Sequence, residues 1–144
     1  MNLEERQQEV IEEFALFDDW MQKYEHIIEL GRELPLIDAD LKNDDHLIRG
    51  CQSRVWLHAD TTPDGAVQFT ADSDAIITKG MIALMIRVLS GLRPEEIAAA
   101  DLHFVNDIGL YEHLSPTRSN GLASMIKQMK IYGLAFQGKE THGN

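Results

Sequence analysis

Apolar residues recur with the period of an α-helix in the first quarter of the chain. In residues 3–17 and again in residues 20–31, apolar side chains return every three or four positions, and the positions between them are mostly acidic or polar. Asp18 and Asp19 interrupt the pattern, and either carboxylate can cap the helix that follows. The spacing therefore predicts two nearly continuous helices, with a bend at the two aspartates and a stop at Gly31.

The periodicity changes to two in the middle of the chain, which predicts β-strands over residues 53–59 and 66–72. Between them, Pro63-Asp64-Gly65 has the composition of a tight turn. A hairpin alone is marginally stable, so it needs a third strand or helices packed on one face. Residues 102–105 are compatible with that third strand or with a loop.

Helical spacing returns in the second half of the chain. Residues 73–91 are apolar nearly all round, which predicts a buried central helix, and Gly80 inside it predicts close packing of the backbone against the sheet. A short helix is expected from Pro94, and the last helix from Ser115-Pro116, because proline suits a first turn. Residues 138–144 are predicted to be a frayed, disordered tail.

These elements predict one α+β domain spanning residues 1–144, with a small antiparallel sheet of about three strands packed against several helices. Its length of 144 residues and its 44% hydrophobic and 26% charged composition are typical of a globular protein. The net charge of −11 argues against nucleic acid as a partner, since phosphate binding needs a basic face. No apolar run approaches membrane-spanning length, so no membrane partner is expected.

The only cysteine, Cys51, limits the chemistry that the chain can perform. It excludes an internal disulfide and a thiolate-based metal site, and no spacing of the histidines indicates another metal site. We therefore expect neither a metal nor a bound cofactor. The N-terminus lacks a basic segment followed by an apolar one, as a signal peptide would have. A lone thiol also suits a reducing compartment, so the prediction is a cytoplasmic protein.

The segment around Cys51 is predicted to be a loop that leads into a strand. Gly50 precedes the cysteine and allows a positive φ or a close backbone approach. Gln52 and Ser53 follow it, and Arg49 and Arg54 flank the group. Positive neighbours favour a thiolate, which is the nucleophilic form of cysteine. These residues therefore predict a candidate reactive thiol with its supporting loop.

Four stretches, in order along the chain, resemble the motifs of one family. Residues 50–56, Gly-Cys-Gln-Ser-Arg-Val-Trp, resemble the signature of SufE-type sulfur-acceptor proteins. Residues 24–35 resemble the first-helix motif of that family, residues 72–80 its Asp-Ser-Asp-Ala stretch with Lys-Gly, and residues 114–122 the start of its last helix. The resemblance extends from about residue 14 to about residue 132.

The resemblance implies a SufE-like fold and a role in iron–sulfur cluster assembly. Cys51 would accept persulfide sulfur from a pyridoxal-phosphate-dependent cysteine desulfurase, stimulate that enzyme, and pass the sulfur to a scaffold complex. Pyridoxal phosphate belongs to the partner, so the chain would be a carrier with a covalent persulfide and not an independent enzyme. The Gly-Cys-Gln-Ser form favours a SufS-type desulfurase and a SufBCD-type scaffold over the related CsdA-type desulfurase branch.

The same motifs indicate secondary site residues. Asp72, Ser73 and Asp74 are expected first as helix caps and second as docking or support residues. For Arg118, a solvated side chain and a role near the Cys51 loop are equally compatible with the sequence.

Two other functions remain open from the residues alone. A self-contained thiol enzyme would activate Cys51 with a histidine such as His58 or His103. A non-catalytic interaction module would carry the cysteine incidentally, since a lone cysteine is commonly a buried structural residue.

Overall fold

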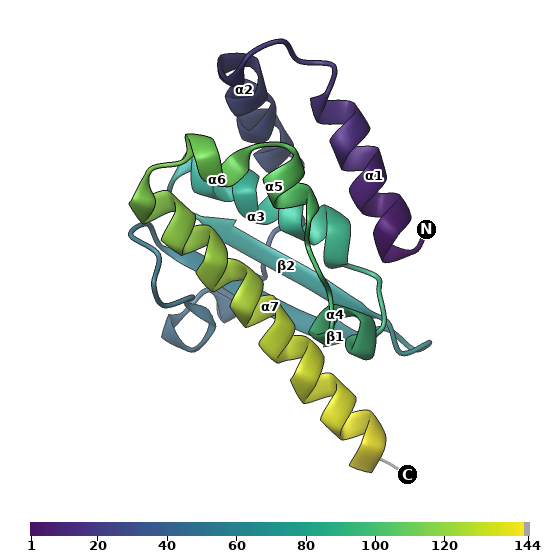
Figure 1. Ribbon diagram of the computed structural model, residues 1–144. Coiled ribbons are helices and arrows are strands. Elements are labelled where there is room, and N and C mark those ends of the chain that lie inside the picture. Colours follow the sequence, from purple (N-terminus) through teal and green to yellow (C-terminus); the bar gives the residue numbers. More distant parts are fainter. Residues whose placement is uncertain (143–144) are drawn as a thin grey trace.

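The computed structural model describes residues 1–142, with side chains placed through Lys139. A β-hairpin lies on one side of the molecule, and helices cover one of its faces (Figure 1). The elements, in chain order, are α1 (Leu3–Phe14), α2 (Trp20–Gly31), the 3-10 turns η1 (Ala39–Leu41) and η2 (Asp44–His46), β1 (Val55–Thr61), β2 (Val67–Ser73), α3 (Ile76–Leu89), α4 (Pro94–Ala98), α5 (Phe104–Asp107), α6 (Leu110–His113) and α7 (Pro116–His142).

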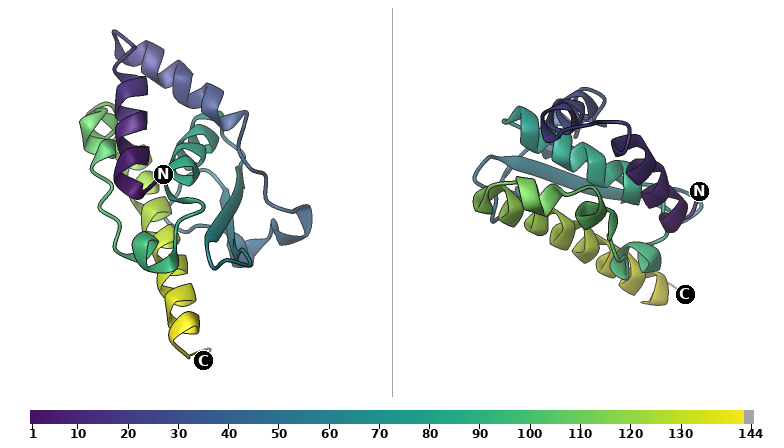
Figure 2. Two further views of the ribbon diagram at one scale, coloured as in Figure 1. Left: turned by 90° about the vertical axis from the view of Figure 1, so that its right-hand side faces the viewer. Right: turned by 45° about the horizontal axis from the view of Figure 1, so that its top comes forward.

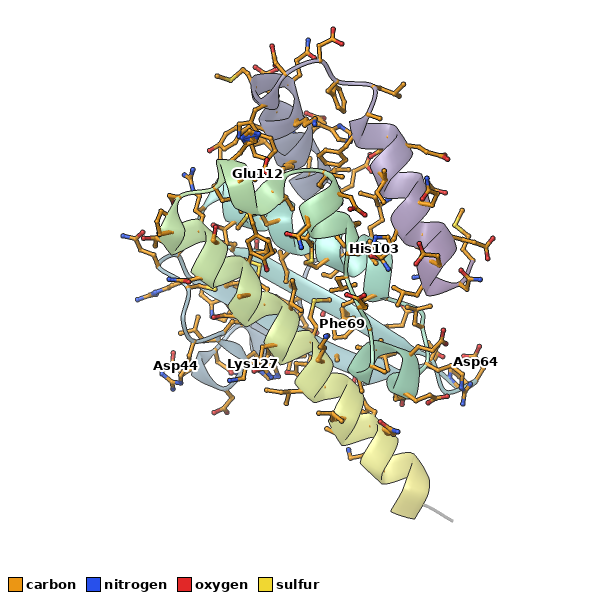
Figure 3. All side chains as sticks on the ribbon, viewed as in Figure 1. Asp44, Asp64, Phe69, His103, Glu112 and Lys127 are labelled. Carbon is orange, nitrogen blue, oxygen red and sulfur yellow. The ribbon has the colours of Figure 1, made fainter. Side chains whose placement is uncertain are left out.

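The hairpin presents alternate residues to the helices. Strands β1 and β2 pair antiparallel, with Leu57 opposite Ala71, and both of these side chains are buried. On the same face Phe69 of β2 lies under α7 (Figure 3), where its ring meets that of Tyr132 edge to face at 6.3 Å. Gly65 forms the turn with φ +87°, a conformation that favours glycine. The hairpin prediction is therefore confirmed.

The sheet of the described residues has two strands, not about three. The flanking segments add only single bridges, Leu36 with Ala71 and Leu47 with Trp56. The third strand considered over residues 102–105 is wrong, because Phe104 and Val105 are the first two residues of helix α5. Both side chains are buried, whereas neighbouring residues of a strand point to opposite faces. A helical turn is the conformation that places both in the core.

Helix α3 is the centre of the core, as its apolar composition predicts, and α1, α2 and α7 pack around it (Figure 2). The predicted close packing of the backbone at Gly80 is present, but the sheet is not its partner. A Cβ at Gly80 would overlap the carbonyl oxygen of Ile27 in α2, so the close approach is to a helix and not to the sheet. Gly31 lies at the same crossing, because a Cβ there would be 2.9 Å from the backbone nitrogen of Gly80. The two glycines let α2 and α3 meet at backbone distance.

The first two helices are separate elements on either side of the predicted bend. α1 ends at Phe14, and the Asp19 carboxylate caps α2 by accepting a hydrogen bond of 2.9 Å from the Gln22 amide. Across the bundle, Arg87 of α3 donates to the Glu13 carboxylate of α1 at 2.7 Å. This ion pair connects the N-terminal helix to the central one.

The last helix begins as predicted and continues further. The Ser115 hydroxyl accepts from the Arg118 amide at 3.3 Å, and Pro116 is the first residue of α7. The predicted tail is helical as far as His142, and residues 143 and 144 lie outside the described part of the chain. The C-terminal end of α7 extends past the sheet (Figure 1). None of the helices within residues 1–142 has the length and apolar composition that crossing a bilayer requires.

Candidate functional site

Cys51 lies on the loop that joins η2 to β1, and Gly50 sets the course of that loop. Gly50 has φ +94°, and a Cβ at this position would overlap the hydroxyl of Ser124 on α7. Two residues before it, the Ile48 amide donates to the Val55 carbonyl at 2.8 Å, which closes the base of the loop. The sequence predicted a positive φ or a close approach at Gly50, and the structure has both.

The Cys51 thiol is half-buried and faces the start of α7. Its sulfur lies 3.5 Å from the Gly121 carbonyl oxygen and donates a weak hydrogen bond to it. Burial raises the pKa of the Cys51 thiol above its ordinary value. A carbonyl acceptor also suits the protonated form, because a thiolate has no hydrogen to donate. The resting form in this loop conformation is therefore the thiol and not the thiolate.

A cavity of about 110 Å³ adjoins the sulfur. One wall is the loop itself, with Cys51, Gln52 and Ser53. The other walls are the starts of two helices, with Ala75 at the N-cap of α3, Ile77 and Thr78 in α3, and Thr117, Arg118 and Gly121 in α7. A water molecule takes up about 30 Å³ in the liquid, so this volume has room for one further sulfur atom.

The Asp72-Ser73-Asp74 stretch supports the loop, but it does not cap a helix. The first prediction for these residues is wrong, since the N-cap of α3 is Ala75 and no side chain caps that helix. Asp74 instead accepts from the Arg54 amide at 3.0 Å, and the Ser73 hydroxyl donates to the Arg54 carbonyl at 2.8 Å. Both side chains turn back toward the start of β1, because β2 runs antiparallel to it and ends there.

Asp72 makes ion pairs on the surface beside this anchor. Its carboxylate lies 2.9 Å from the Lys42 ammonium and 3.5 Å from that of Lys79. Hydrogen bonds from Lys42 and from the Ser73 amide hold the pKa of Asp72 below its ordinary value, although burial opposes them as the largest single effect. Asp72 therefore connects the loop of η1, the end of β2 and α3.

Of the three arginines that the sequence associates with Cys51, one lines the cavity. Arg118 is that residue, and its guanidinium also lies 5.8 Å from the centre of the Tyr24 ring. Arg49 lines a separate groove between η2 and α7, together with Asp44 and Lys127 (Figure 3). Neither Arg49 nor Arg54 lines the cavity. Of the positively charged side chains expected near the sulfur, only Arg118 is therefore a lining residue.

The two histidines proposed as activating bases lie elsewhere. His103 uses both ring nitrogens on carboxylates, at 2.6 Å from Asp107 and 2.9 Å from Glu4, beside α1 (Figure 3). His58 lies 3.1 Å from Asp60. No histidine lines the Cys51 cavity, and the hydrogen bonds of the described residues include none between an imidazole and the Cys51 sulfur. The hypothesis of a self-contained thiol enzyme therefore lacks the histidine base that it requires beside Cys51.

Sequence reasoning did not select Thr78 or Ser124, although both lie against the Cys51 loop or its cavity. Neither belongs to a motif that carries chemistry, and only the packing of α3 and α7 against the loop brings them there. For Ser124 alone, the sequence offered a weak signal. Ser124 lies three positions after Gly121 on the predicted last helix, so the two residues share one face of that helix. Among residues 1–142, no group of three or more histidine, cysteine or carboxylate side chains is arranged to hold a metal ion.

Comparison with known proteins gives matches over most of the chain. The SufE family model, described as an Fe-S metabolism associated domain, matches residues 8–132. A Rhizobium meliloti (strain 1021) protein named as an uncharacterized SufE-like protein is 39% identical over 126 residues, or 85% of this chain and 90% of that protein. A Rhizobium etli protein with the same kind of name is 39% identical over 126 residues, or 85% of each chain.

The fold also matches a solved structure. The solution structure of a hypothetical protein from Thermus thermophilus superimposes with a TM-score of 0.76, over 92% of this chain and 96% of that one. At 19% identity this likeness concerns the α+β fold alone. The family model and the two relatives show more than the fold: this chain belongs to the SufE family of Fe-S metabolism associated proteins.

Proposed function

We propose that Cys51 accepts sulfane sulfur from the persulfide of a cysteine desulfurase. The Cys51 thiolate attacks the terminal sulfur of that persulfide and forms a new S–S bond. The S–S bond of the desulfurase breaks, and its cysteine leaves as a thiolate that takes up a proton. The products are Cys51–S–SH and a regenerated desulfurase thiol, so the transfer needs no external oxidant or reductant.

One observation carries this proposal: the only thiol of the chain lies on a glycine-hinged loop beside a cavity with room for an added sulfur. A single thiol suits a carrier, because a second one nearby would attack the persulfide and release its sulfur. The half-buried position also suits it, since exposed thiolates and persulfides oxidise readily. Membership of the SufE family adds the link to Fe-S metabolism.

The resting geometry implies a movement before transfer. Attack requires a thiolate, and burial disfavours that form. When the loop lifts from α7, the thiol leaves the Gly121 carbonyl, enters water, and its pKa returns toward the ordinary value. Gly50 allows this movement because a glycine, which has φ +94° in the closed loop, adopts positive and negative φ about equally readily. We propose that docking on the desulfurase drives this opening.

The finer assignment follows the family motifs. The protein stimulates its desulfurase by removing the persulfide sulfur, and passes this sulfur to an iron–sulfur scaffold in a reducing, cytoplasmic environment. A SufS-type desulfurase and a SufBCD-type scaffold are the proposed partners, and pyridoxal phosphate remains on the desulfurase. Pull-down with each class of desulfurase distinguishes this branch from the CsdA-type alternative.

Intact-protein mass spectrometry tests the proposal. After incubation with desulfurase and free cysteine, the wild type is expected to gain the mass of one sulfur atom and to lose it on treatment with a reducing thiol. Cys51→Ser, which replaces only the sulfur, should gain no mass and give no stimulation. No added mass on the wild type would contradict the carrier role. Full stimulation by Cys51→Ser would favour the interaction module.

A further inference from the structure

The segment between α2 and β1 lies on the outer face of the hairpin, away from α3 and α7 (Figure 2). On β1 the side chains of Val55, Leu57 and Ala59 are buried in the core, so the side chains between them face outward, toward that segment. His58 is one of these. His46, the last residue of η2, packs against it, with the two ring centres 5.0 Å apart and the rings inclined at 68°. The fold therefore pairs two imidazoles that no sequence motif connects.

His58 has one ring nitrogen with a partner and one without. Its Nε2 lies 3.1 Å from the Asp60 carboxylate. A carboxylate only accepts hydrogen bonds, so the proton of the neutral imidazole is on Nε2 and the lone pair is on Nδ1. The Nδ1 atom is buried, and among the described residues it has no hydrogen-bond partner. A buried polar atom without a partner costs free energy, which a bound metal ion would recover.

His46 also has one ring nitrogen held by an oxygen. Its Nδ1 lies 3.1 Å from the amide oxygen of Asn43, which also accepts from the Asp45 amide at 3.0 Å. An oxygen acceptor favours the proton on Nδ1 and leaves the lone pair on Nε2, for which the hydrogen bonds of residues 1–142 include no partner. Histidines that bind metals characteristically donate their other ring N–H to an oxygen in this way. Both imidazoles therefore have the tautomer of a metal ligand.

The separation of the two rings fits one shared metal ion. A Zn–N bond of about 2.0 Å puts the centre of a bound imidazole about 3 Å from the metal, and a tetrahedral angle then separates two ring centres by about 5 Å. The separation in the structure is 5.0 Å. Within residues 1–142 no third histidine, cysteine or carboxylate completes a group of ligands, so water would take the other positions. Imidazole ligands suit zinc, copper, iron and nickel, whereas magnesium and calcium prefer oxygen.

We propose that His46 and His58 form a binding site for one divalent transition-metal ion, represented by Zn²⁺, which fastens η2 to β1. The site is separate from the Cys51 cavity, and the inference goes beyond the proposed function without resting on it. The bound ion adds a connection next to the hydrogen bond of 2.8 Å from the Ile48 amide to the Val55 carbonyl, which closes the base of the Cys51 loop. Metal binding should therefore make this base open less often.

Calorimetric titration with Zn²⁺ tests the site in the Cys51→Ser chain, because a thiolate would itself bind zinc. Saturable binding is expected at about pH 7.5, where both imidazoles are mostly neutral. His46→Gln and His58→Gln should each weaken it by about tenfold or more, since even the loss of an outer partner of a ligand costs that much. His113→Gln is the matched control, because His113 is exposed and packs against Trp20 instead. It should bind Zn²⁺ as the parent chain does, and melting temperatures check that each variant folds.

Two further measurements separate a histidine site from general attraction of cations to a chain with a net charge of −11. Mg²⁺ at the same concentration should not compete with Zn²⁺, because it prefers oxygen ligands. Zn²⁺ should slow hydrogen exchange of the Ile48 amide in the parent chain but not in His58→Gln. The site is refuted if Zn²⁺ does not bind saturably, or if both histidine variants bind it as tightly as the parent. Binding that leaves the Ile48 exchange rate unchanged would overturn the fastening of η2. None of these readouts involves sulfur transfer, so they are independent of the carrier role.

Discussion

Replacing Gly50 by alanine tests whether the Cys51 loop is held down by its contact with α7. The loop passes Ser124 at Gly50 with no space for a side chain, since an added Cβ would overlap the Ser124 hydroxyl and lie 3.3 Å from the Ser124 Cβ. Gly50 also has φ +94°, a backbone conformation that is sterically unfavourable for a residue with a Cβ. Gly50→Ala therefore strains the closed loop in two independent ways, and we expect the proposed opening of the loop to relieve both.

The magnitude follows from the two strains. A left-handed backbone conformation costs a non-glycine residue about 1–2 kcal/mol. Turning Ser124 away from its position costs a further ~1 kcal/mol, as for an off-rotamer side chain. Together they disfavour the closed loop by about 2–3 kcal/mol, which shifts the ratio of open to closed loop about 30- to 150-fold. The free energy of unfolding falls by the same amount, or by the cost of opening the loop if that is smaller.

The rate at which neutral iodoacetamide alkylates Cys51 reports the open fraction. The Gly50→Ala chain should react faster than the wild type by up to that factor at the same pH, and urea denaturation should give the loss of stability. Adding Ser124→Gly removes the overlap but not the backbone strain. The double variant should therefore recover about a third of the lost closed-state stability.

Gly138→Ala is the matched control, because a Cβ at this position of α7 would meet nothing within 4 Å. It should leave the alkylation rate unchanged and stabilise the helix by about 0.5–1 kcal/mol. The reasoning is refuted if Gly50→Ala reacts at the wild-type rate and its stability differs by less than about 0.5 kcal/mol, as for an ordinary surface substitution.

Three further outcomes are expected. Gly80→Ala should lower the free energy of unfolding by about 2 kcal/mol in urea, although alanine is the better helix former, because its Cβ overlaps the Ile27 carbonyl where α2 crosses α3; equal or greater stability would contradict the close crossing. The hydrogen bond from Arg87 lowers the pKa of Glu13, so this carboxylate contributes stability above its ordinary pKa of about 4.5 and loses it as the pH falls through the lower folded value. Melting temperatures of Glu13→Gln should therefore approach those of the wild type on acidification, and a constant difference between them would argue against the linkage. For the wild type, the alkylation rate of Cys51 should rise with a midpoint above the pKa of a free cysteine, about 8.5, because burial raises it; a midpoint below 8.5 would indicate a cationic site instead.

The local elements could be predicted from the sequence because their signals are short-range. Alternation and the Pro63-Asp64-Gly65 turn predicted the hairpin, and apolar periodicity predicted the four long helices. The errors occurred where tertiary contacts decided the outcome. Phe104 and Val105 are β-formers by propensity, but both must be buried, and a helical turn achieves this. Asp74 is an ideal cap by type, yet the end of the hairpin offers its carboxylate the Arg54 amide instead.

For the site, the sequence by itself determined the proposed nucleophile, since Cys51 is the only thiol, and the proposed hinge, since Gly50 precedes it. It also carried the resemblance to the SufE family, to which the comparisons assign the chain. Only the tertiary structure decided the surroundings of the sulfur. Arg49 and Arg54 are its neighbours in sequence, but Thr78, Arg118 and Gly121 surround it in space. The physical reason is that a loop has no periodicity to direct its side chains, so the helices packed against it select which groups meet.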